Sequence, residues 1–308
     1  MNEFNITYNN HRNVKLIAEK NAVCVDRIPS DGIYESVIVS LFDDKGNRFD
    51  SQPTKRINNK FMIKFNNIRP GRYVMSCFKK DFVYEKYSRW FGRIPIIMHP
   101  NRMMSFEQSP VYMNNINCVQ QITRQLVNKR INLGTSSPTI KNFAKNITRT
   151  CSSSYAATMF IHDCISQTIS YDKDSYAKIL RKESFNHAIV CDPLLVLSSK
   201  KGVCAGYSNL AVAMLTSIGI PAKTISCYAL GFNTEGKWSK ANIQAELNHV
   251  ITAAWTDHGC VLMDITWDCV NDYQNGRIIP KKAFTREYFD PTLQFLSCTH
   301  KLLSIMDC

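Results

Sequence analysis

The sequence from residue 200 to residue 225 is KKGVCAGYSNLAVAMLTSIGIPAKTI. A glycine on either side of Cys204 predicts a tight turn, and the apolar residues that follow recur at the spacing of one buried helix face as far as Ile218. The Gly-Ile-Pro segment at residues 219–221 predicts the end of that helix. Cys204 is therefore expected in the first turn of a mostly apolar helix, where unpaired backbone N–H groups and the positive end of the helix dipole favour a thiolate.

Cys204 has two interpretations, a prepared nucleophile or one small buried residue among twelve cysteines. A second segment, residues 246–268, bears on this choice; its sequence is ELNHVITAAWTDHGCVLMDITWD. Aromatic and β-branched residues on both sides of a turn at residues 256–259 predict two paired strands. A turn of that length pairs Trp255 with Cys260.

The same register carries further along the predicted hairpin. It places Ile251 opposite Asp264 and His249 opposite Thr266. Because alternate residues of a strand share a face, His249 and Asp264 become diagonal neighbours on one side of the hairpin, within reach of a side-chain hydrogen bond. A loop of odd length would break this parity.

A cysteine on a helix N-terminus, with a histidine and an aspartate on paired strands, supplies a nucleophile, a base and a group that orients the base. With these residues the sequence resembles the transglutaminase-like superfamily, whose core has a papain-type arrangement and a Cys, His, Asp triad in this chain order. The resemblance implies that Cys204, His249 and Asp264 are catalytic. It is carried by residues 202–207 (GVCAGY), 219–222 (GIPA), 248–249 (NH), 264–268 (DITWD) and 161–172 (IHDCISQTISYD), within roughly residues 140–300.

The sequence departs from the family pattern in two respects. Ile251 stands where members usually have a tryptophan two residues after the histidine, which predicts a different wall beside the triad. Calcium-dependent animal members carry acidic loops, and no acidic ligand cluster is visible here. We therefore expect no calcium activation, no metal site and no cofactor.

Two helices are predicted before the nucleophile segment, at residues 138–151 and 154–169, each preceded by a serine or threonine. His162 and Cys164 lie too close in sequence to share a helix face, so they are interpreted as structural residues. Tyr171 directly follows the second of these helices. The resemblance implies that it packs behind the active site.

Composition places the chain among globular proteins. Of its 308 residues, 44% are hydrophobic and 20% are charged, enough for one large or two ordinary domains. No apolar run approaches the ~20 residues of a membrane span, and the polar start lacks the regions of a signal peptide, so a cytoplasmic protein without a membrane span is expected. The cysteines are scattered singly, which predicts reduced thiols and no zinc-finger site.

The net charge of +13 raises the question of a nucleic-acid partner. Lysine and arginine occur as singles and doubles, without a basic helix or a stacking motif of aromatic residues. This distribution favours a solvated surface over a nucleic-acid site. A basic surface could still attract acidic protein substrates or anionic membranes.

Short segments of β pattern run from about residue 14 to residue 99, with turns at residues 43–46 and 69–71. They predict a small β-sandwich. Residues 65–74 resemble the strand, Pro-Gly turn, strand element of immunoglobulin-like modules. We therefore expect two domains, an immunoglobulin-like β-sandwich over residues 1–110 and a transglutaminase-like catalytic domain over residues 111–308.

The predicted fold class is α+β, an N-terminal β-sandwich followed by a papain-like transglutaminase core. The expected function is thiol-dependent acyl transfer or hydrolysis on protein or peptide amides, with Cys204 attacking, His249 protonating the departing amine and Asp264 holding His249 in its tautomer. Peptidase, deamidase and transglutaminase outcomes stay open, as do the substrate, the second oxyanion donor, the role of the N-terminal domain and the oligomeric state. The alternative is a catalytically silent transglutaminase-like scaffold for protein binding.

Overall fold

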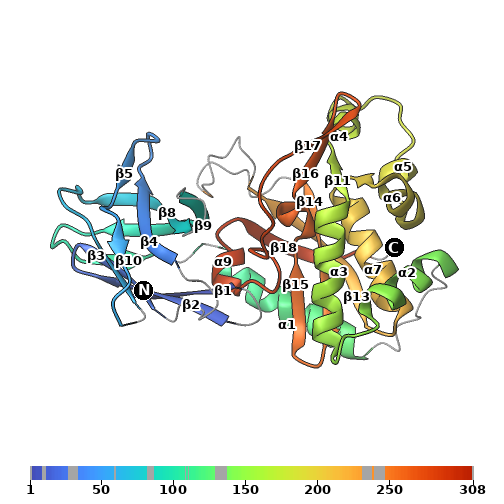
Figure 1. Cartoon of the computed structure of the whole chain (residues 1–308), viewed down its shortest axis with the longest axis horizontal. Helices are drawn as coiled ribbons and strands as arrows, with labels where there is room; N and C mark the ends of the chain where they lie inside the picture. Colours follow the sequence, from blue (N-terminus) through green and yellow to red (C-terminus); the bar gives the residue numbers. More distant parts are fainter. Residues whose placement is uncertain are drawn as a thin grey trace. The chain divides into compact units, whose positions relative to one another are not determined.

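The computed structural model places the chain in two compact units (Figure 1). The first unit comprises residues 1–113, 230–241 and 291–300, and the second comprises residues 114–229, 242–290 and 301–308. The first unit takes segments from both sides of residue 110, and the domain boundary at that residue stays a prediction. The structure describes residues 2–8, 12–26, 34–58, 60–81, 87–107, 109, 111–128, 137–230, 238 and 247–306.

The first unit contains two antiparallel sheets. One has the strand order β1 (Glu3–Tyr8), β2 (Arg12–Glu19), β3 (Ala22–Asp26), β7 (Phe61–Lys64). The other has the order β10 (Met104–Phe106), β9 (Tyr87–Met98), β8 (Gly71–Asp81), β4 (Tyr34–Phe42), β5 (Arg48–Asp50), and β6 (Thr54–Lys55) also pairs with β4. The unit also holds the short helix α9 (Leu293–Leu296).

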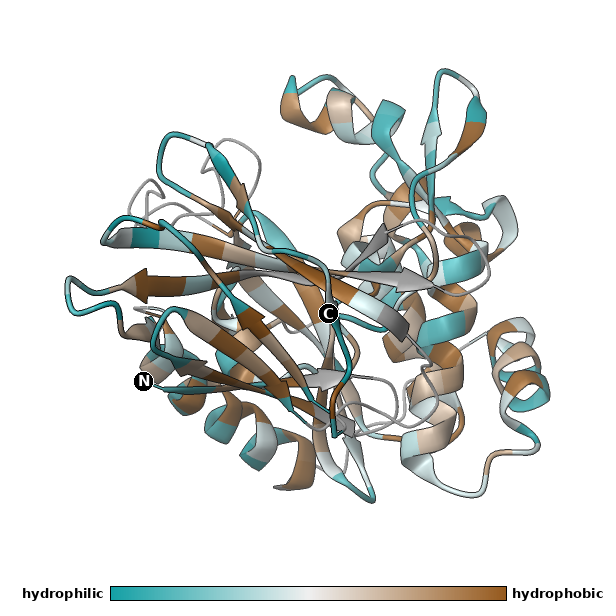
Figure 2. Ribbon diagram, turned by 60° about the vertical axis from the view of Figure 1, so that its left-hand side comes forward, coloured by the Kyte–Doolittle hydropathy of each residue, from teal (hydrophilic) through white to brown (hydrophobic). Residues whose placement is uncertain are grey.

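The β pattern predicted for residues 14–99 is confirmed where the structure describes that range, and residues 27–33, 59 and 82–86 lie outside the described part. Alternate burial is clear in β7, where Phe61 and Ile63 are buried and the residues between and after them are exposed. Gly46 ends the predicted turn after β4 with a φ of +84°, a left-handed value that favours glycine. Figure 2 shows hydrophobic residues (brown) along the strands and polar residues (teal) at the turns between them.

The second unit combines helices with two further sheets. Its sheets have the orders β15 (Gly259–Met263), β14 (His249–Thr256), β13 (Ala222–Ala229), β18 (His300–Ile305) and β12 (Lys201–Gly202), β11 (Ser170–Asp172), β16 (Asn271–Gln274), β17 (Arg277–Pro280). Its helices are α1 (Tyr112–Asn128), α2 (Pro138–Thr148), α3 (Ser154–Thr168), α4 (Lys173–Leu180), α5 (Ala188–Cys191), α6 (Pro193–Ser199), α7 (Cys204–Ser217) and α8 (Ile265–Asp268).

Helix α7 is the centre of this unit. Tyr207, Leu210 and Met214 are fully buried on it, and the helix packs against β14, α2, α3 and α6. Its predicted end is confirmed, because the helix stops at Ser217 and Gly219 takes a φ of +90°. Cys204, the first residue of α7, is thus attached to a helix that is packed in the core of the unit.

The helices predicted at residues 138–151 and 154–169 are confirmed as α2 and α3, within a few residues at their ends. Ser137 caps α2 by accepting a hydrogen bond from the Thr139 N–H at 3.3 Å, and Ser153 caps α3 by accepting from the Ala156 N–H at 3.0 Å. Within the described residues, no helix has the length and apolarity needed to cross a membrane.

Candidate active site

Cys204 is the first residue of α7, and it is half-buried. The residue before it, Val203, is extended and makes no side-chain hydrogen bond to the helix. The backbone N–H groups of the first turn therefore have no acceptor from the cap residue, and the positive end of the helix dipole lies at the thiol. The Val203 N–H itself donates to the Val190 carbonyl at 3.4 Å, which ties the turn to α5.

The glycine after Cys204 is required by packing. A Cβ atom on Gly206 would lie 2.1 Å from the Val190 carbonyl oxygen and 2.9 Å from Cγ2 of Val196. Only a residue without a side chain lets α5 and α6 approach α7 this closely. The sequence predicted a turn here, and the structure shows that Gly206 belongs to the helix and permits a close approach of backbone to helix.

The hairpin formed by β14 and β15 has the predicted register. Trp255 pairs with Cys260, and the ladder continues to Thr252 opposite Met263. There it ends, because the Asp264 side chain accepts a hydrogen bond from the Trp267 N–H at 3.1 Å and caps the short helix α8.

Two expectations drawn from this register are therefore wrong. Asp264 is the N-cap of a helix and does not lie in the strand. Thr266 is inside α8, so it does not face His249 across the hairpin. A carboxylate that can cap a helix ends a strand, since its side chain satisfies an N–H group two or three residues ahead.

The predicted contact between His249 and Asp264 is present despite that change. His249 Nε2 lies 2.8 Å from Oδ2 of Asp264, and the two residues are only 8% and 1% exposed. The Asp264 carboxylate thus receives the Trp267 N–H on one oxygen and faces the imidazole with the other.

His249 also interacts with Cys204. Burial by itself would lower the pKa of His249, but the charge of Asp264, its hydrogen bond and a hydrogen bond with the Cys204 side chain together raise that pKa to about 10. Since Nε2 faces Asp264, Nδ1 is the ring nitrogen available to the thiol. The imidazole therefore holds a proton at neutral pH, between a carboxylate and a cysteine.

Aromatic residues surround this group of three. The ring of Trp267 lies 6.2 Å from the His249 ring and 5.0 Å from the Tyr288 ring. Tyr171 contacts Tyr176 edge-on at 5.7 Å, and burial, followed by the nearby Cys204, raises the pKa of both phenols. The ring beside His249 thus comes from α8, two residues after its first.

The absent tryptophan at position 251 has the predicted consequence only in part. Ile251 is buried in β14, so that position contributes no aromatic wall. Trp267 provides an aromatic ring beside His249 from another element. The only sequence signal for it was its place in the DITWD segment at residues 264–268.

Comparison with protein families places this site in a known context. Residues 141–265, which include Cys204, His249 and Asp264, match the family model of the transglutaminase-like superfamily. Over these residues the chain is similar to that superfamily. The match covers the first part of the region in which the sequence resemblance was found, roughly residues 140–300, and it does not extend to the first unit's sheets. A comparison with curated proteins gave no match.

Solved structures similar to this chain share little sequence with it. A TGase structure is 17% identical, with 50% of this chain and 38% of that chain covered and a TM-score of 0.33. A proposed cysteine protease from Cytophaga hutchinsonii is 13% identical, with 96% and 85% covered and a TM-score of 0.32. Red sea bream transglutaminase is 11% identical, with 80% and 48% covered and a TM-score of 0.27. The chain thus spans less than half of each transglutaminase.

Proposed function

We propose that this chain is a thiol-dependent enzyme that acts on amides of proteins or peptides through Cys204, His249 and Asp264. The observation that carries the proposal is the 2.8 Å contact between His249 Nε2 and Asp264 Oδ2, with Cys204 among the neighbours that raise the pKa of the same imidazole. A nucleophile, a proton carrier and an orienting carboxylate thus stand in series. The family match over residues 141–265 supports the same chemistry.

The reaction would begin with attack of the Cys204 thiolate on the carbonyl carbon of a carboxamide or peptide bond. The carbonyl oxygen becomes an oxyanion, for which the backbone N–H of Cys204 at the start of α7 is a donor. The C–N bond then breaks as His249 gives its proton to the departing amine, leaving a thioester on Cys204. Asp264 holds the imidazole in place and stabilises its charged form during these steps.

The thioester is then attacked by water or by an amine, and His249 accepts the proton of the attacking group. Water on a side-chain thioester gives deamidation, water on a peptide thioester gives proteolysis, and an amine gives a cross-link. Cross-linking requires a pocket that excludes water. We leave these three outcomes to the experiment below.

The first unit contains none of the three candidate catalytic residues, which all lie in the second unit. We propose that its two antiparallel sheets form the predicted immunoglobulin-like β-sandwich. Buried residues from both sheets support this, such as Val25 and Phe61 from one and Val39 and Met75 from the other. Such a module would bind or position a protein substrate.

The decisive experiment compares Cys204→Ala with Cys164→Ala, a matched change of another half-buried cysteine. We expect Cys204→Ala to abolish turnover of glutamine-containing peptides or protein substrates and Cys164→Ala to retain it. Mass spectrometry separates the outcomes as a carboxylate in place of an amide, new chain ends or an amine adduct. Full activity of Cys204→Ala would refute the proposal and favour the silent scaffold.

A labelling experiment tests the thiol without a known substrate. Iodoacetamide should alkylate Cys204 before the buried cysteines, because this thiol is only half-buried, stands at the start of α7 and has His249 beside it as a proton acceptor. His249→Ala should slow that reaction and leave the labelling of Cys164 unchanged. Uniform labelling of all accessible cysteines would count against a prepared nucleophile.

A further inference from the structure

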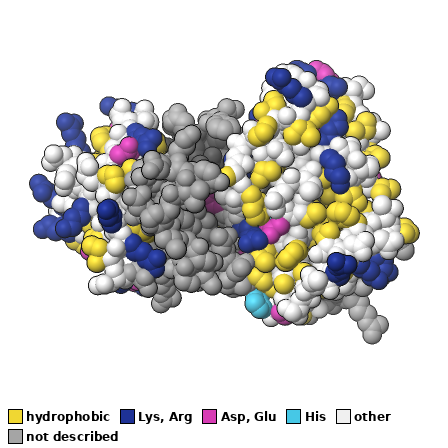
Figure 3. Space-filling model, viewed as in Figure 1, with side chains coloured by type: hydrophobic (Ala, Val, Ile, Leu, Met, Phe, Trp, Pro, Cys, Tyr) yellow, Lys and Arg dark blue, Asp and Glu magenta, His cyan; other side chains and the backbone are white. Residues whose placement is uncertain are grey.

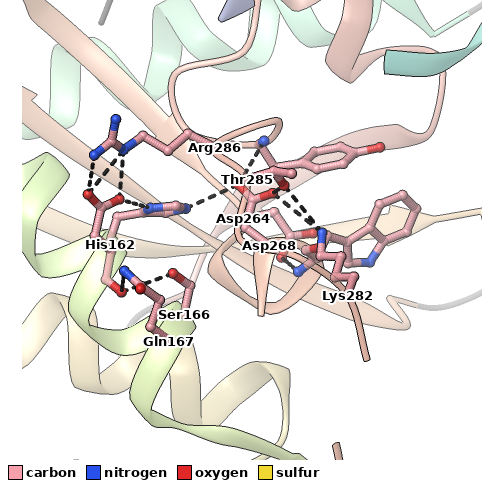
Figure 4. A network of polar contacts seen from close by, with 11 residues as sticks. His162, Ser166, Gln167, Asp264, Asp268, Lys282, Thr285 and Arg286 are labelled. Carbon is pink, nitrogen blue, oxygen red and sulfur yellow. Dashed lines mark hydrogen bonds and ion pairs between the residues drawn. The ribbon is translucent and has the colours of Figure 1, made fainter. Parts of the chain in front are cut away.

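A second buried histidine and carboxylate pair lies in the same unit (Figure 4). His162, on α3, is fully buried, and its Nε2 lies 3.2 Å from Oδ2 of Asp268, the last residue of α8. Its Nδ1 lies 3.1 Å from Oδ1 of Asp163. The proposed chemistry uses none of these residues.

The surroundings of His162 favour its charged form. Burial opposes the charged form, but hydrogen bonds and charges from Asp163 and Asp268 outweigh it and raise the pKa of His162. The Arg286 guanidinium balances the negative charge of Asp163, because its Nε lies 2.9 and 3.0 Å from the two carboxylate oxygens. With a carboxylate at each nitrogen, the imidazolium can donate both of its N–H groups.

Asp268 is held from several sides. Its Oδ2 accepts the backbone N–H of Tyr288 at 2.8 Å as well as facing His162. Its Oδ1 accepts the hydroxyl of Thr285 at 3.0 Å, and the Lys282 ammonium lies 3.7 Å away. The end of α8 is therefore fixed by partners from α3 and from residues 282–288.

The same segment also holds the start of α8. The backbone N–H of Asp264 donates to the Tyr288 carbonyl at 3.0 Å, while the Tyr288 N–H donates to Asp268. A helix of four residues has almost no stability of its own, because its first turn fixes many dihedral angles for few hydrogen bonds. The position of α8, and with it the Asp264 carboxylate, consequently depends on these outside contacts.

Helix α3 can supply a fixed point for that purpose. It is 15 residues long, and Ile161 and Ile165, which flank His162 on the helix, are buried in the core of the unit. The His162 ring also contacts the ring of Phe289 at 5.1 Å. The His162 side chain thus connects α3, which is packed in the core, to the short helix α8.

We propose that His162 is a positioning residue of the candidate active site. Through Asp268 it fixes α8, and thereby the Asp264 carboxylate that orients His249. The inference rests on the proposed function for its effect on turnover. The alternative is that His162 only satisfies buried carboxylates and stabilises the fold, without influence on the geometry at His249.

The test uses His162→Gln, which keeps a hydrogen-bonding side chain but removes the positive charge and the rigid ring that faces a carboxylate with each nitrogen. The matched control is Gln167→Ala on the same helix, an exposed residue that bonds only to the Asp163 carbonyl among the contacts of Figure 4. We expect His162→Gln to lower kcat about 10- to 100-fold with KM nearly unchanged, because small misplacements of catalytic groups act on the chemical step. Gln167→Ala should match the wild-type protein.

A second readout does not require turnover. The proton between His249 and Asp264 should give a downfield NMR signal in protein with labelled histidines, assigned by its loss in His249→Gln. We expect that signal to shift or broaden in His162→Gln and to stay in place in Gln167→Ala. An unchanged signal and an unchanged kcat in folded His162→Gln would overturn the inference.

The outcomes separate the two proposals. If the wild-type protein turns over no amide and Cys204 labels like other thiols, the proposed function fails, and the NMR signal still decides the positioning role. If His162→Gln does not fold, Thr285→Val removes the hydroxyl that Asp268 accepts from the other side. A shifted signal in that variant supports the coupling of Asp268 to Asp264, and an unshifted one refutes it.

Discussion

The second unit has two pairs of a buried histidine and a carboxylate, and they differ in the other partners of the imidazole ring. His249 faces Asp264 with Nε2 and leaves its other nitrogen to the Cys204 side chain. His162 faces a carboxylate with each nitrogen, and its side chain is fully buried. The pKa of both rings is raised, but His249 also has a cysteine thiol beside it, the group that a nucleophilic mechanism needs. The chemical role of a buried histidine is therefore set by what its second nitrogen contacts.

The pairs are also linked, because Asp264 and Asp268 stand at the two ends of α8. One carboxylate orients the imidazole at the candidate site, and the other attaches the helix to α3 and to residues 282–288. Changes at the first should act on chemistry, and changes at the second on position and stability. The following predictions test that distinction, from the largest expected effect to the smallest.

Asp264→Asn should lower kcat by about 10³- to 10⁴-fold, because the amide can donate to His249 Nε2 and place the imidazole proton on the nitrogen that faces Cys204. Turnover measured on a peptide substrate, with circular dichroism for the fold, checks this. Asp257→Asn, in the turn of the same hairpin, is the control and should retain activity. Turnover of Asp264→Asn within a few-fold of wild type would remove the orienting role.

His162→Ala should show the opposite pattern to Asp264→Asn. We expect it to lower the stability of the fold more than it lowers kcat. We expect a loss of about 3 kcal/mol in the free energy of unfolding, since the variant removes the buried imidazole that faces the buried Asp268 carboxylate. Urea unfolding of the variant beside the wild-type protein measures this loss, and an unchanged free energy of unfolding would contradict it.

The stability contributed by protonated His249 should depend on pH. Its folded-state pKa of about 10 lies above the ordinary value of 6.5, so its contribution is fully present below pH 6.5 and is lost as the pH rises through about 10. The difference in unfolding free energy between wild type and His249→Gln should therefore shrink between those values. A difference that grows with pH would show that the neutral imidazole is the favoured form.

Arg286→Gln should have the smallest effect. The guanidinium is partly exposed and contacts Asp163, while the bond from His162 to Asp268 remains. We expect a loss of about 1 kcal/mol in unfolding free energy and a change in kcat of no more than a few-fold. Thermal unfolding and steady-state kinetics measure these values, and a loss of kcat as large as that of His162→Gln would place Arg286 in the positioning network.

The distribution of lysine and arginine over the surface bears on the kind of partner that the chain could bind. On the face shown in Figure 3, lysine and arginine side chains (dark blue) lie in several separate groups among apolar and neutral atoms. The charge pattern of the sequence predicted such a dispersed surface. A protein or peptide stays our expectation for the substrate, and such a surface could attract acidic substrates or anionic membranes.

Local rules of sequence predicted the parts of the site that depend on near neighbours. The apolar spacing after Cys204 predicted α7, and Gly219 marked its end because a left-handed residue follows the helix. The length of the turn predicted the pairing of Trp255 with Cys260. Together these placed His249 close enough to Asp264 for the contact that the structure shows.

Other parts could not be predicted in this way. A strand pattern continued through Asp264, but its side chain satisfies the Trp267 N–H and starts α8, a competition that alternation of residues does not express. Gly206 was assigned to a turn, whereas its reason is the Val190 carbonyl that packs against it from α5.

The sequence by itself thus determined the order of Cys204, His249 and Asp264 along the chain, the helix that begins at Cys204 and the pairing of β14 with β15. Only the tertiary structure decided which groups hold those residues in place. His162 and Asp268 are separated by 106 residues, and spacing within one helix or hairpin carries no information about such a pair. Their contact arises because α3 and α8 pack in one core, where a buried charge is stable only beside an opposite charge from another part of the chain.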